Sequence, residues 1–470
     1  MKHIFKILFL TFIVSNISAA QQVMWQRYYD VNNKPDSGQD VLHTFDGGYA
    51  FCGYGGGSLL LMKVNSMGIP EWQRVIPDSN SRYRAYSMQQ TNDSGFIITG
   101  DVRNDSMLLL KTDKNGIQEW HKTFTNPNGL SRGYSIKITN DNGYIICGDI
   151  FYFSPPGIKA YVVKTDSVGN LQWSMEYDSL FSSDIIQTSD NNYYFIGGSS
   201  LKKINSDGYL LWTRFIGNGL YKFIIYSDSI FFICGTQTIS YSYMKLSKVD
   251  TTGNIYWQKT YNENSNCVNL CMTNNGDIAM IGTAFCDSIN PVVNVAILKV
   301  DQTGKLLFSS RINSTTNING EAFAIKSTFD NGFIISGATD YGGTSFNINA
   351  LVIKTDSLGN TSKIVNIENN GVSFSNDFVL YQNYPNPFNP TSILEFEISE
   401  NGPPRRIVSL KVYNALGMEV ADLVNEKKSA GRYSVSFDGS NLPSGVYFYK
   451  LSVTGGGRDF TETKRMVLLK

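Results

Sequence analysis

KTDKNGIQEW (residues 111–120) is one copy of a phrase that recurs along the chain, for example as KTDSVGNLQW at 164–173 and KVDTTGNIYW at 248–257. Seven copies share the core Lys-x-Asp/Asn-x-x-Gly, and successive copies start 39 to 55 residues apart. This period is typical of a four-stranded propeller blade with loops of variable length. The aromatic positions of the repeat, including one near the N-terminus, are Trp25, Trp72, Trp120, Trp173, Trp212, Trp257 and Phe308.

Each copy contains four strand-length apolar runs separated by Asn, Asp and Gly clusters, the pattern of linked hairpins. The last copy has Lys363 at the aromatic position, whereas MWQRYY (24–29) looks like an outer strand without its own blade. We therefore predict an all-β fold with a seven-bladed β-propeller over residues 21–365. In it, an N-terminal strand at 23–29 completes the last blade and removes exposed sheet edges.

Composition limits the class of partner and the compartment. The 470 residues carry 40 basic and 40 acidic side chains, and this balance argues against nucleic acid as a partner. Residues 1–20 have the lysines, apolar core and small terminal residues of a signal peptide. No later stretch approaches 18 consecutive apolar residues, so we expect no transmembrane segment and a soluble, exported protein.

The cysteines and histidines form no cluster with the spacing of a zinc site, and we expect no metal. Cys52, Cys147 and Cys234 occupy one equivalent repeat position and are expected to be buried apolar side chains. An oxidising compartment would allow one disulfide among Cys267, Cys271 and Cys286, although we expect it not to form.

The Asp-x-x-Gly-x-x-x-Trp phrase resembles the repeat of quinoprotein-like propellers. That resemblance implies that each Trp docks between neighbouring blades, and nothing in the chain marks a quinone or haem site, so no cofactor is expected. A calcium loop would need several alternating oxygen ligands and a bidentate Glu, which the copies lack. The Asp is instead expected to cap the turn, and the Gly to adopt a positive φ.

Residues 379–470 differ from the repeats and follow a polar linker at 366–378. Their ordered motifs closely resemble the type A sorting domain of the type IX secretion system. The resemblance implies a small Ig-like β-sandwich, recognition by that secretion machinery, and a mature protein released or anchored on the outer surface after removal of the signal peptide and sorting domain. The residues that carry it are Tyr384, Pro385, Asn386, Pro387, Phe388, Asn389, Gly417, Pro443, Gly445, Tyr447 and Tyr449.

No nucleophile elbow or catalytic triad is recognisable, and we name no catalytic residue. The loops on one propeller face vary most, and aromatic and Arg side chains there are typical of interaction surfaces. The predicted function is non-enzymatic binding of a glycan or a protein. The alternatives are a polysaccharide hydrolase or lyase and a structural scaffold of the outer surface. The candidate ligand-binding residues are Tyr83, Arg84, Asp101, Arg103, Arg132, Asp149, Tyr152 and Tyr341.

Overall fold

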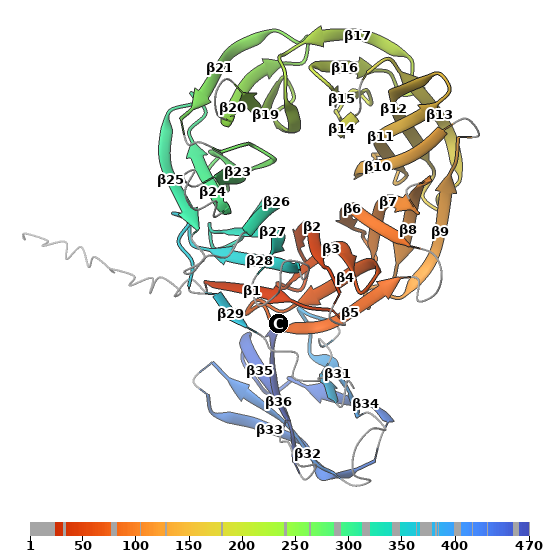
Figure 1. Ribbon diagram of the computed structural model, residues 1–470. Coiled ribbons are helices and arrows are strands. Elements are labelled where there is room, and N and C mark those ends of the chain that lie inside the picture. Colours follow the sequence, from red (N-terminus) through yellow and green to blue (C-terminus); the bar gives the residue numbers. More distant parts are fainter. Residues whose placement is uncertain are drawn as a thin grey trace, which may run out of the picture. The chain divides into compact units, whose positions relative to one another are not determined.

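A computed structural model describes residues 24–469 apart from short gaps (Figure 1). The gaps are 32–33, 77–81, 104, 127–128, 180–181, 239–241, 263–264, 286–292, 313–319, 341–347, 363, 367–377, 381–382, 384, 399–405, 416, 430 and 455–459. All elements of the described residues are strands, so the predicted all-β class is confirmed. The chain divides into two compact units between Glu368 and Asn369. The predicted signal peptide lies outside the described residues.

Seven sheets follow one another in the first unit. The first contains β2 (Ser37–His43), β3 (Tyr49–Gly55), β4 (Ser58–Val64) and β5 (Pro70–Ile76). The second contains β6 (Tyr83–Gln90), β7 (Phe96–Val102), β8 (Ser106–Thr112) and β9 (Gln118–Phe124). The third contains β10 (Gly129–Ile138), β11 (Tyr144–Phe153), β12 (Pro156–Thr165) and β13 (Leu171–Tyr177). The fourth contains β14 (Ser182–Gln187), β15 (Tyr193–Gly197), β16 (Ser200–Ile204) and β17 (Leu210–Phe215). The fifth contains β18 (Leu220–Ser227), β19 (Ile230–Thr238), β20 (Ser242–Asp250) and β21 (Ile255–Tyr261). The sixth contains β22 (Asn269–Met272), β23 (Ile278–Phe285), β24 (Val293–Val300) and β25 (Leu306–Ile312). The last contains β26 (Gly320–Ser327), β27 (Phe333–Thr339), β28 (Asn349–Thr355), β1 (Trp25–Tyr29) and β29 (Ile364–Asn366).

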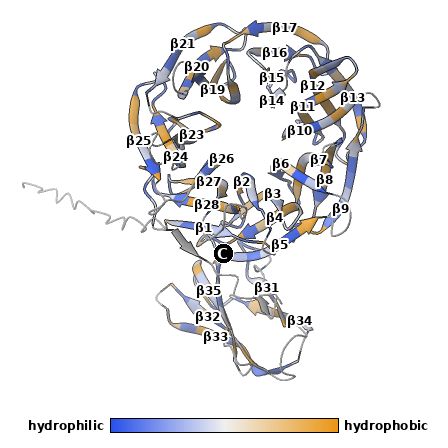
Figure 2. Ribbon diagram, viewed as in Figure 1, coloured by the Kyte–Doolittle hydropathy of each residue, from blue (hydrophilic) through white to orange (hydrophobic). Residues whose placement is uncertain are grey.

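The sheets are the blades of a propeller. The first strand of each blade contacts the first strands of both neighbouring blades, and β2 contacts β26 as well as β6. These seven inner strands therefore form a closed ring around one axis (Figure 1). Hydrophobic residues follow the middle strands β7, β8, β11 and β12 (Figure 2), and their side chains are buried between neighbouring blades.

The N-terminal strand belongs to the last blade. β1 pairs antiparallel with β28, with Trp25 opposite Lys354, and lies outside it as a fourth strand. β29 then pairs in parallel with β1 and extends to Asn366, one residue beyond the predicted end of the propeller. The two ends of the repeat region are thus joined by backbone hydrogen bonds within one sheet.

The repeated glycine accommodates an aromatic ring from the preceding blade. Gly116 has φ +74°, and a Cβ placed on it would lie 2.5 Å from the Trp72 ring. Gly169 meets Trp120 in the same way, at 2.6 Å. Only a residue without a side chain fits both the positive φ and the close approach. The Trp side chains therefore lie at blade–blade contacts, as the repeat predicted.

The first blade receives its ring from the N-terminal strand. A Cβ on Gly68, at φ +74°, would lie 2.9 Å from the Trp25 ring and 2.7 Å from Arg27 Nε. Trp25 Nε1 donates a hydrogen bond to the Ser66 carbonyl at 3.0 Å, and the Tyr29 hydroxyl donates to the Gly68 carbonyl at 2.8 Å. β1 is thus fixed to the last blade by its backbone and to the first blade by its side chains.

The other recurring residues of the repeat also have structural roles. In the second blade, Asp113 Oδ1 accepts hydrogen bonds from the backbone N–H groups of Asn115 and Ile117, both at 2.8 Å. The buried Lys111 forms an ion pair with Asp93 in the turn between β6 and β7, at 2.7 Å. Equivalent pairs are Lys63–Asp46, Lys164–Asp141, Lys203–Asp190, Lys299–Asp277 and Lys354–Asp330. In these six blades the Lys links the two turns at one end of the blade, and ligand binding is not needed to explain the motif.

The second unit contains two sheets. One has the order β30 (Phe378–Leu380), β31 (Thr391–Ile398) and β34 (Gly431–Asp438). The other has the order β33 (Glu419–Lys428), β32 (Arg406–Asn414), β35 (Gly445–Thr454) and β36 (Phe460–Leu468). Buried apolar residues of both sheets form one core, which is the arrangement of a small β-sandwich. β30 begins one residue before the predicted start of this domain.

The first C-terminal motif fastens the last strand of the sandwich. The backbone of Phe388 donates to the Val467 carbonyl and accepts from Leu469, both at 2.9 Å, and its ring is 2% exposed. Asn386 Oδ1 accepts a hydrogen bond from the Val467 N–H at 2.9 Å. Pro385, Pro387 and Asn389 lie in the same segment, and Tyr384 lies outside the described residues.

The second and third motifs support turns and the core. Gly417 adopts φ +77° in the turn after Asn414. The Tyr447 hydroxyl donates to the Pro443 carbonyl at 2.8 Å, and the Tyr449 oxygen accepts from the Asn383 N–H at 2.8 Å. Gly445 begins β35. The motif residues that the structure describes are thus structural parts of one sandwich.

Two glycine variants of the first blade test the contact that closes the propeller. Gly68→Ala introduces a Cβ at positive φ and against Trp25, whereas Gly47→Ala introduces one at φ +88° with no atom within 4 Å. We expect Gly47→Ala to cost about 1–2 kcal/mol from backbone strain, and Gly68→Ala to cost roughly 1–3 kcal/mol more from overpacking. Chemical denaturation of the two variants measures the difference. Equal losses of stability would contradict closure by β1.

Candidate ligand-binding site

Six of the seven inner strands contain a β-bulge at the same place. The register of each strand against its partner shifts at Gly38/Asp40, Ala85/Ser87, Gly133/Ser135, Ser182/Asp184, Leu220/Lys222 and Ala322/Ala324. The extra residue of each bulge is Gln39, Tyr86, Tyr134, Ser183, Tyr221 or Phe323, and all six line a cavity on the axis. A bulge re-aims a side chain that a regular strand would place elsewhere.

A glycine in the second strand makes room for the bulged inner strand in five of the six blades that have the bulge. A Cβ on Gly100 would lie 1.7 Å from the Arg84 carbonyl oxygen, and one on Gly148 would lie 1.8 Å from that of Arg132. The same close approach occurs at Gly53, Gly235, Gly282 and Gly337. The second-strand glycine, which follows Cys, Thr, Ile or Ser, therefore allows the backbone of the inner strand to approach closely.

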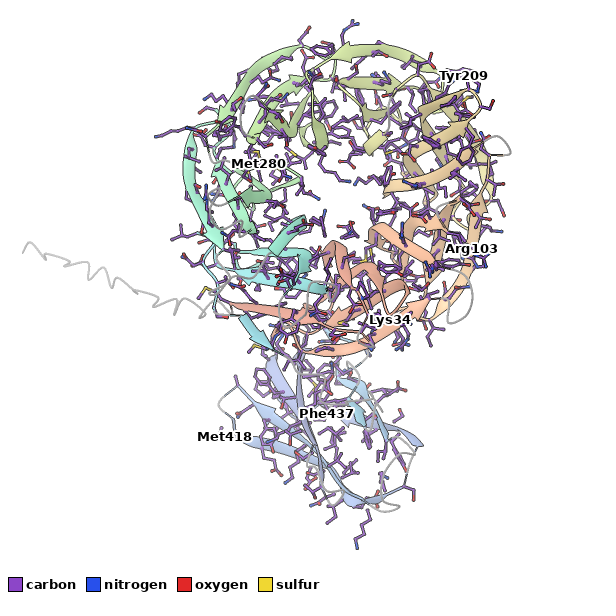
Figure 3. All side chains as sticks on the ribbon, in the orientation of Figure 1. Lys34, Arg103, Tyr209, Met280, Met418 and Phe437 are labelled. Carbon is purple, nitrogen blue, oxygen red and sulfur yellow. The ribbon has the colours of Figure 1, made fainter. Side chains whose placement is uncertain are left out.

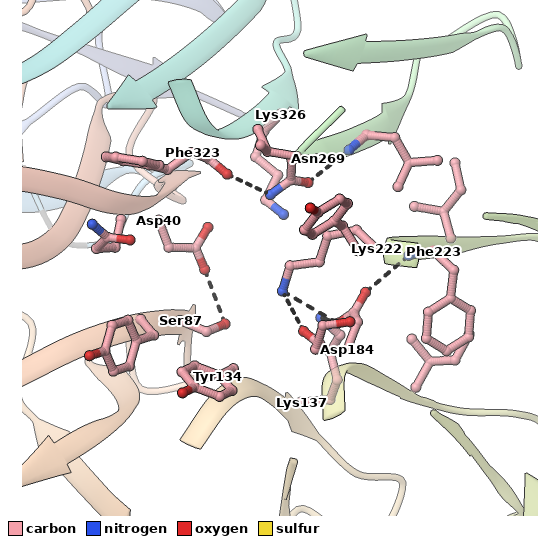
Figure 4. A pocket seen from close by; sticks show the side chains of 18 of the residues that line it. Asp40, Ser87, Tyr134, Lys137, Asp184, Lys222, Phe223, Asn269, Phe323 and Lys326 are labelled. Carbon is pink, nitrogen blue, oxygen red and sulfur yellow. Dashed lines mark hydrogen bonds and ion pairs between the residues drawn. The ribbon is translucent and has the colours of Figure 1, made fainter. Parts of the chain in front are cut away.

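The cavity has a volume of about 530 Å³ and is lined by residues from all seven inner strands (Figure 4). Its aromatic lining consists of Tyr86, Tyr134, Tyr221 and Phe323, each at a bulge, and of Phe223. The volume lies within the range typical of small-molecule sites. The inner strands thus enclose a site that is concave and partly aromatic.

The second and third blades carry the same polar unit next to this cavity. In the second blade Arg84 lies opposite Asp101 across β6 and β7, and Tyr86 follows two residues after the Arg. In the third blade Arg132 lies opposite Asp149 across β10 and β11 and is followed two residues later by Tyr134. We call these six residues the tandem Arg-Tyr-Asp units. The pattern occurs in no other blade of the sequence.

The two units are in contact with each other. The rings of Tyr86 and Tyr134 meet edge to face with their centroids 5.3 Å apart. The Tyr134 hydroxyl donates a hydrogen bond to Asp149 Oδ2 at 3.1 Å. Because each Tyr occupies a bulge and each Asp follows a bulge-accommodating Gly, the same backbone feature positions both members of each unit.

The charges of the third-blade unit depend on one another. Burial raises the pKa of Asp149; the Tyr134 hydroxyl and the Arg132 charge oppose this rise, and the negative charge of Asp101 adds to it. Burial and the nearby Asp149 raise the pKa of Tyr134 to about 12, so its hydroxyl stays protonated at neutral pH. The neighbouring hydroxyl and carboxylates raise the pKa of Arg132 despite its burial.

The structure brings together four of the eight residues predicted to bind a ligand: Arg84, Asp101, Arg132 and Asp149. Tyr83 points elsewhere, because its hydroxyl lies 3.5 Å from His121 Nε2 on the outer strand β9. Tyr152 lies near Asn126, with 3.5 Å between the hydroxyl and Nδ2, and Arg103 lies farther from the axis than β6 (Figure 3). Tyr341 lies outside the described residues.

Sequence reasoning missed the residues that face the cavity. They include Tyr86, Tyr134, Lys137, Asp184, Lys222 and Lys326, all on inner strands. One available signal was the repetition of Arg-x-Tyr-Ser at 84–87 and 132–135. This repetition lies on inner strands, whereas the predicted site was assigned to the variable loops.

None of the described cysteines lines this cavity. Cys52, Cys147, Cys234, Cys267 and Cys271 are free and buried, and Cys286 lies outside the described residues. Cys267 and Cys271 belong to different hydrophobic clusters, on opposite sides of β22. Within the described part of the chain, no three His, Cys, Asp or Glu side chains form a group that could hold a metal ion.

Replacing Tyr134 by Phe tests the coupling within the unit. The hydroxyl stabilises the charged form of Asp149, so its removal is expected to raise the pKa of that carboxyl further. A ¹³C NMR titration of Asp carboxyl groups measures the change. Asp141 of the same blade is an internal control. Partial burial raises its pKa, but hydrogen bonds from Lys164 and Thr139 lower it to about 2. An Asp149 pKa that stays constant or falls would contradict the assignment.

Comparisons with known proteins concern the two units separately. Residues 382–467 match the family described as the secretion system C-terminal sorting domain. A search of curated proteins finds no sequence match. In the part of the chain that is described, no helix is long and apolar enough to cross a membrane.

Solved structures resemble the chain at low identity. They include the WD40 β-propeller domain of Doa1, with 13% identity over 70% of this chain and 96% of that one, at a TM-score of 0.47. PorZ of Porphyromonas gingivalis, an essential surface component of the type IX secretion system, has 10% identity over 90% of this chain and 64% of its own, at a TM-score of 0.38. A gluconolactonase of Xanthomonas campestris has 9% identity over 70% and 97%, at a TM-score of 0.37. These likenesses say nothing about activity.

Three observations identify the C-terminal unit in the same way: its sandwich core, the hydrogen bonds that fasten its last strand, and the family match. Residues 382–467 are a C-terminal sorting domain of the type IX secretion system, and the chain is a β-propeller protein that this domain directs to the cell surface or the extracellular space.

Proposed function

We propose that the propeller is a non-enzymatic binding module of the cell exterior, and that its ligand is a glycan held at the tandem Arg-Tyr-Asp units. The observation that carries the proposal is the repetition of this unit in two adjacent blades. Four other blades have the same bulge without this combination of Arg, Tyr and Asp. The fold therefore does not require these side chains, and a ligand gives a reason for their presence.

The shape of the site favours a glycan over a protein. A cavity of about 530 Å³ with aromatic walls suits a few sugar rings, whereas protein partners usually cover broad surfaces. Arg84 and Arg132 lie within hydrogen-bonding reach of the Tyr86 and Tyr134 hydroxyls, and donors beside aromatic residues suit hydroxyl-rich ligands. Delivery to the exterior by the sorting domain would bring the module into contact with extracellular polysaccharide.

The carboxylates lining the cavity favour binding over catalysis. Asp40 Oδ2 accepts hydrogen bonds from the Ser87 hydroxyl at 3.1 Å and the Met88 N–H at 3.0 Å. Asp184 accepts from the Ser135 hydroxyl at 2.6 Å and the Phe223 N–H at 3.2 Å. Both carboxylates join neighbouring blades, so neither is free to act as a general acid or base on a substrate.

A polysaccharide hydrolase or lyase is the second candidate function. The specific observation in its favour is the raised pKa of Asp149 beside the negative charge of Asp101. Paired carboxyl groups with separated pKa values are typical of glycosidic cleavage. A scaffold role on the outer surface has no such observation to support it.

A glycan array and a polysaccharide turnover assay on the intact exported protein test the proposal. We expect binding without turnover, and at least about tenfold weaker binding by the double variant Arg84→Gln/Arg132→Gln, as for the loss of charge-assisted hydrogen bonds. The matched control is Arg74→Gln/Arg214→Gln, which removes the same charge from outer strands where each Arg lies over a Trp ring. Released oligosaccharide products, equal loss in both variants, or binding to proteins alone would contradict the proposal.

A truncation tests the sorting assignment independently. A stop codon that removes residues 441–470 deletes β35 and β36, the latter being the strand held by Phe388. The sandwich core then cannot form, and we expect the propeller to accumulate in the periplasm. Cell fractionation with an antibody to the propeller measures the outcome. Surface delivery at the level of the full chain would overturn the assignment.

A further inference from the structure

Three lysines from three blades line the axial cavity: Lys137 on β10, Lys222 on β18 and Lys326 on β26 (Figure 4). The carboxylates that line it are Asp40 and Asp184. Among the described lining residues, positive charge therefore exceeds negative charge by one. A positive excess inside a cavity with protein walls concentrates anions there.

Lys137 and Lys222 both pair with Asp184, and this pairing leaves most of their N–H donors unused. Lys137 Nζ lies 3.5 Å from Asp184 Oδ1 and Lys222 Nζ lies 3.8 Å from it, so these are ion pairs at longer than hydrogen-bond distance. The carboxylate already accepts short hydrogen bonds from Ser135 and Phe223. Each ammonium group has three N–H donors. Lys222 uses one toward the Ser183 carbonyl at 3.1 Å, and donors of both lysines remain for a ligand.

The ion pairs also keep this cluster charged. Burial alone would raise the pKa of Asp184, but the charges of Lys137 and Lys222 hold it below its ordinary value. Burial alone would lower the pKa of Lys137, but Asp184 and then Asp40 raise it. Asp184 and Lys137 are consequently both charged at neutral pH.

Lys326 supplies the excess charge. No hydrogen bond or ion pair joins it to another described residue, yet its side chain is half-buried and lines the cavity. It lies on the same strand as Phe323, whose carbonyl accepts a hydrogen bond from Asn269 Nδ2 at 3.0 Å. A half-buried cation of this kind gains most from an anionic partner, because the cavity wall already excludes part of its water.

We infer that the axial cavity binds the carboxylate group of an acidic saccharide, such as a hexuronate, through Lys326, Lys222 and Lys137, with the sugar ring against Tyr134 and Phe323. This inference rests on the proposed function, because it specifies the chemistry of a ligand that the tandem Arg-Tyr-Asp units would help to hold. It adds that the ligand is anionic and that its acidic group lies on the axis.

Calorimetric titration of the intact exported protein with glucuronate, glucose and acetate tests the inference. We expect glucuronate to bind at least about tenfold more tightly than glucose, since charge-assisted hydrogen bonds separate the two. Acetate is expected to bind more weakly than glucuronate because it lacks the ring. Raised salt should weaken glucuronate binding and leave glucose unchanged.

Variants of Lys326 assign the effect to the cavity. Lys326→Gln is expected to weaken glucuronate binding at least about tenfold, and Lys326→Arg to retain most of it, because the charge is kept. Lys305→Gln, in an exposed turn of the sixth blade, is the control with the same change of net charge. Melting curves of the variants should match the parent, since Lys326 has no described partner to lose.

Two results of these titrations would overturn the inference, and a third comes from the glycan array. One is equal affinity for glucuronate and glucose or acetate; the other is equal binding by the Lys326→Gln and Lys305→Gln variants. Neutral glycans that bind in an Arg84- and Arg132-dependent way would overturn this inference while leaving the proposed function intact. If glucuronate binds but no glycan on the array does, the result would support the cavity site and contradict the proposed function.

Discussion

The contact between an aromatic ring of one blade and the turn glycine of the next is the interaction on which the propeller depends. Gly116 accommodates Trp72, and Gly68 accommodates Trp25 from the N-terminal strand. The contact combines a backbone requirement with a packing requirement, because the glycine must have positive φ and must lack a side chain. The contact recurs at most blade boundaries, where it fixes neighbouring blades against each other, and β1 supplies the aromatic side chain that the last blade lacks.

A second backbone constraint turns this scaffold into a potential site. The bulged inner strands place one extra residue per blade next to the axis, and a glycine of the second strand makes room for the bulge. The repeat dictates where these positions are and leaves their side chains free to vary. Function can therefore differ between such propellers through the residues at a few equivalent positions, while the Trp, Asp, Gly and Lys of the repeat remain structural.

Much of the fold could be predicted from the sequence because the repeat encodes local geometry. The spacing of Lys111, Gly116 and Trp120 indicated a hairpin, the resemblance to quinoprotein-like repeats implied the interblade contact, and the orphan Trp25 indicated closure. The ion pair between Lys111 and Asp93 was not predicted, since it joins turns 18 residues apart. The site was only half predicted for a related reason. Bulges shift which side chains face the axis, and neither Tyr134 nor Lys326 could be placed there before the register was known.

Hydrogen exchange of the intact exported protein, with and without an acidic oligosaccharide, tests most directly whether function resides at the inner strands and not in the repeat. Ligand contact should slow exchange in Arg84–Gln90 of β6, Arg132–Ile138 of β10 and the neighbourhood of Lys326, since opening of these strands would have to release the ligand. The turns of the repeat, such as Asp113–Ile117, should exchange at unchanged rates. Protection confined to those turns, with the inner strands unaffected, would contradict this view of the molecule.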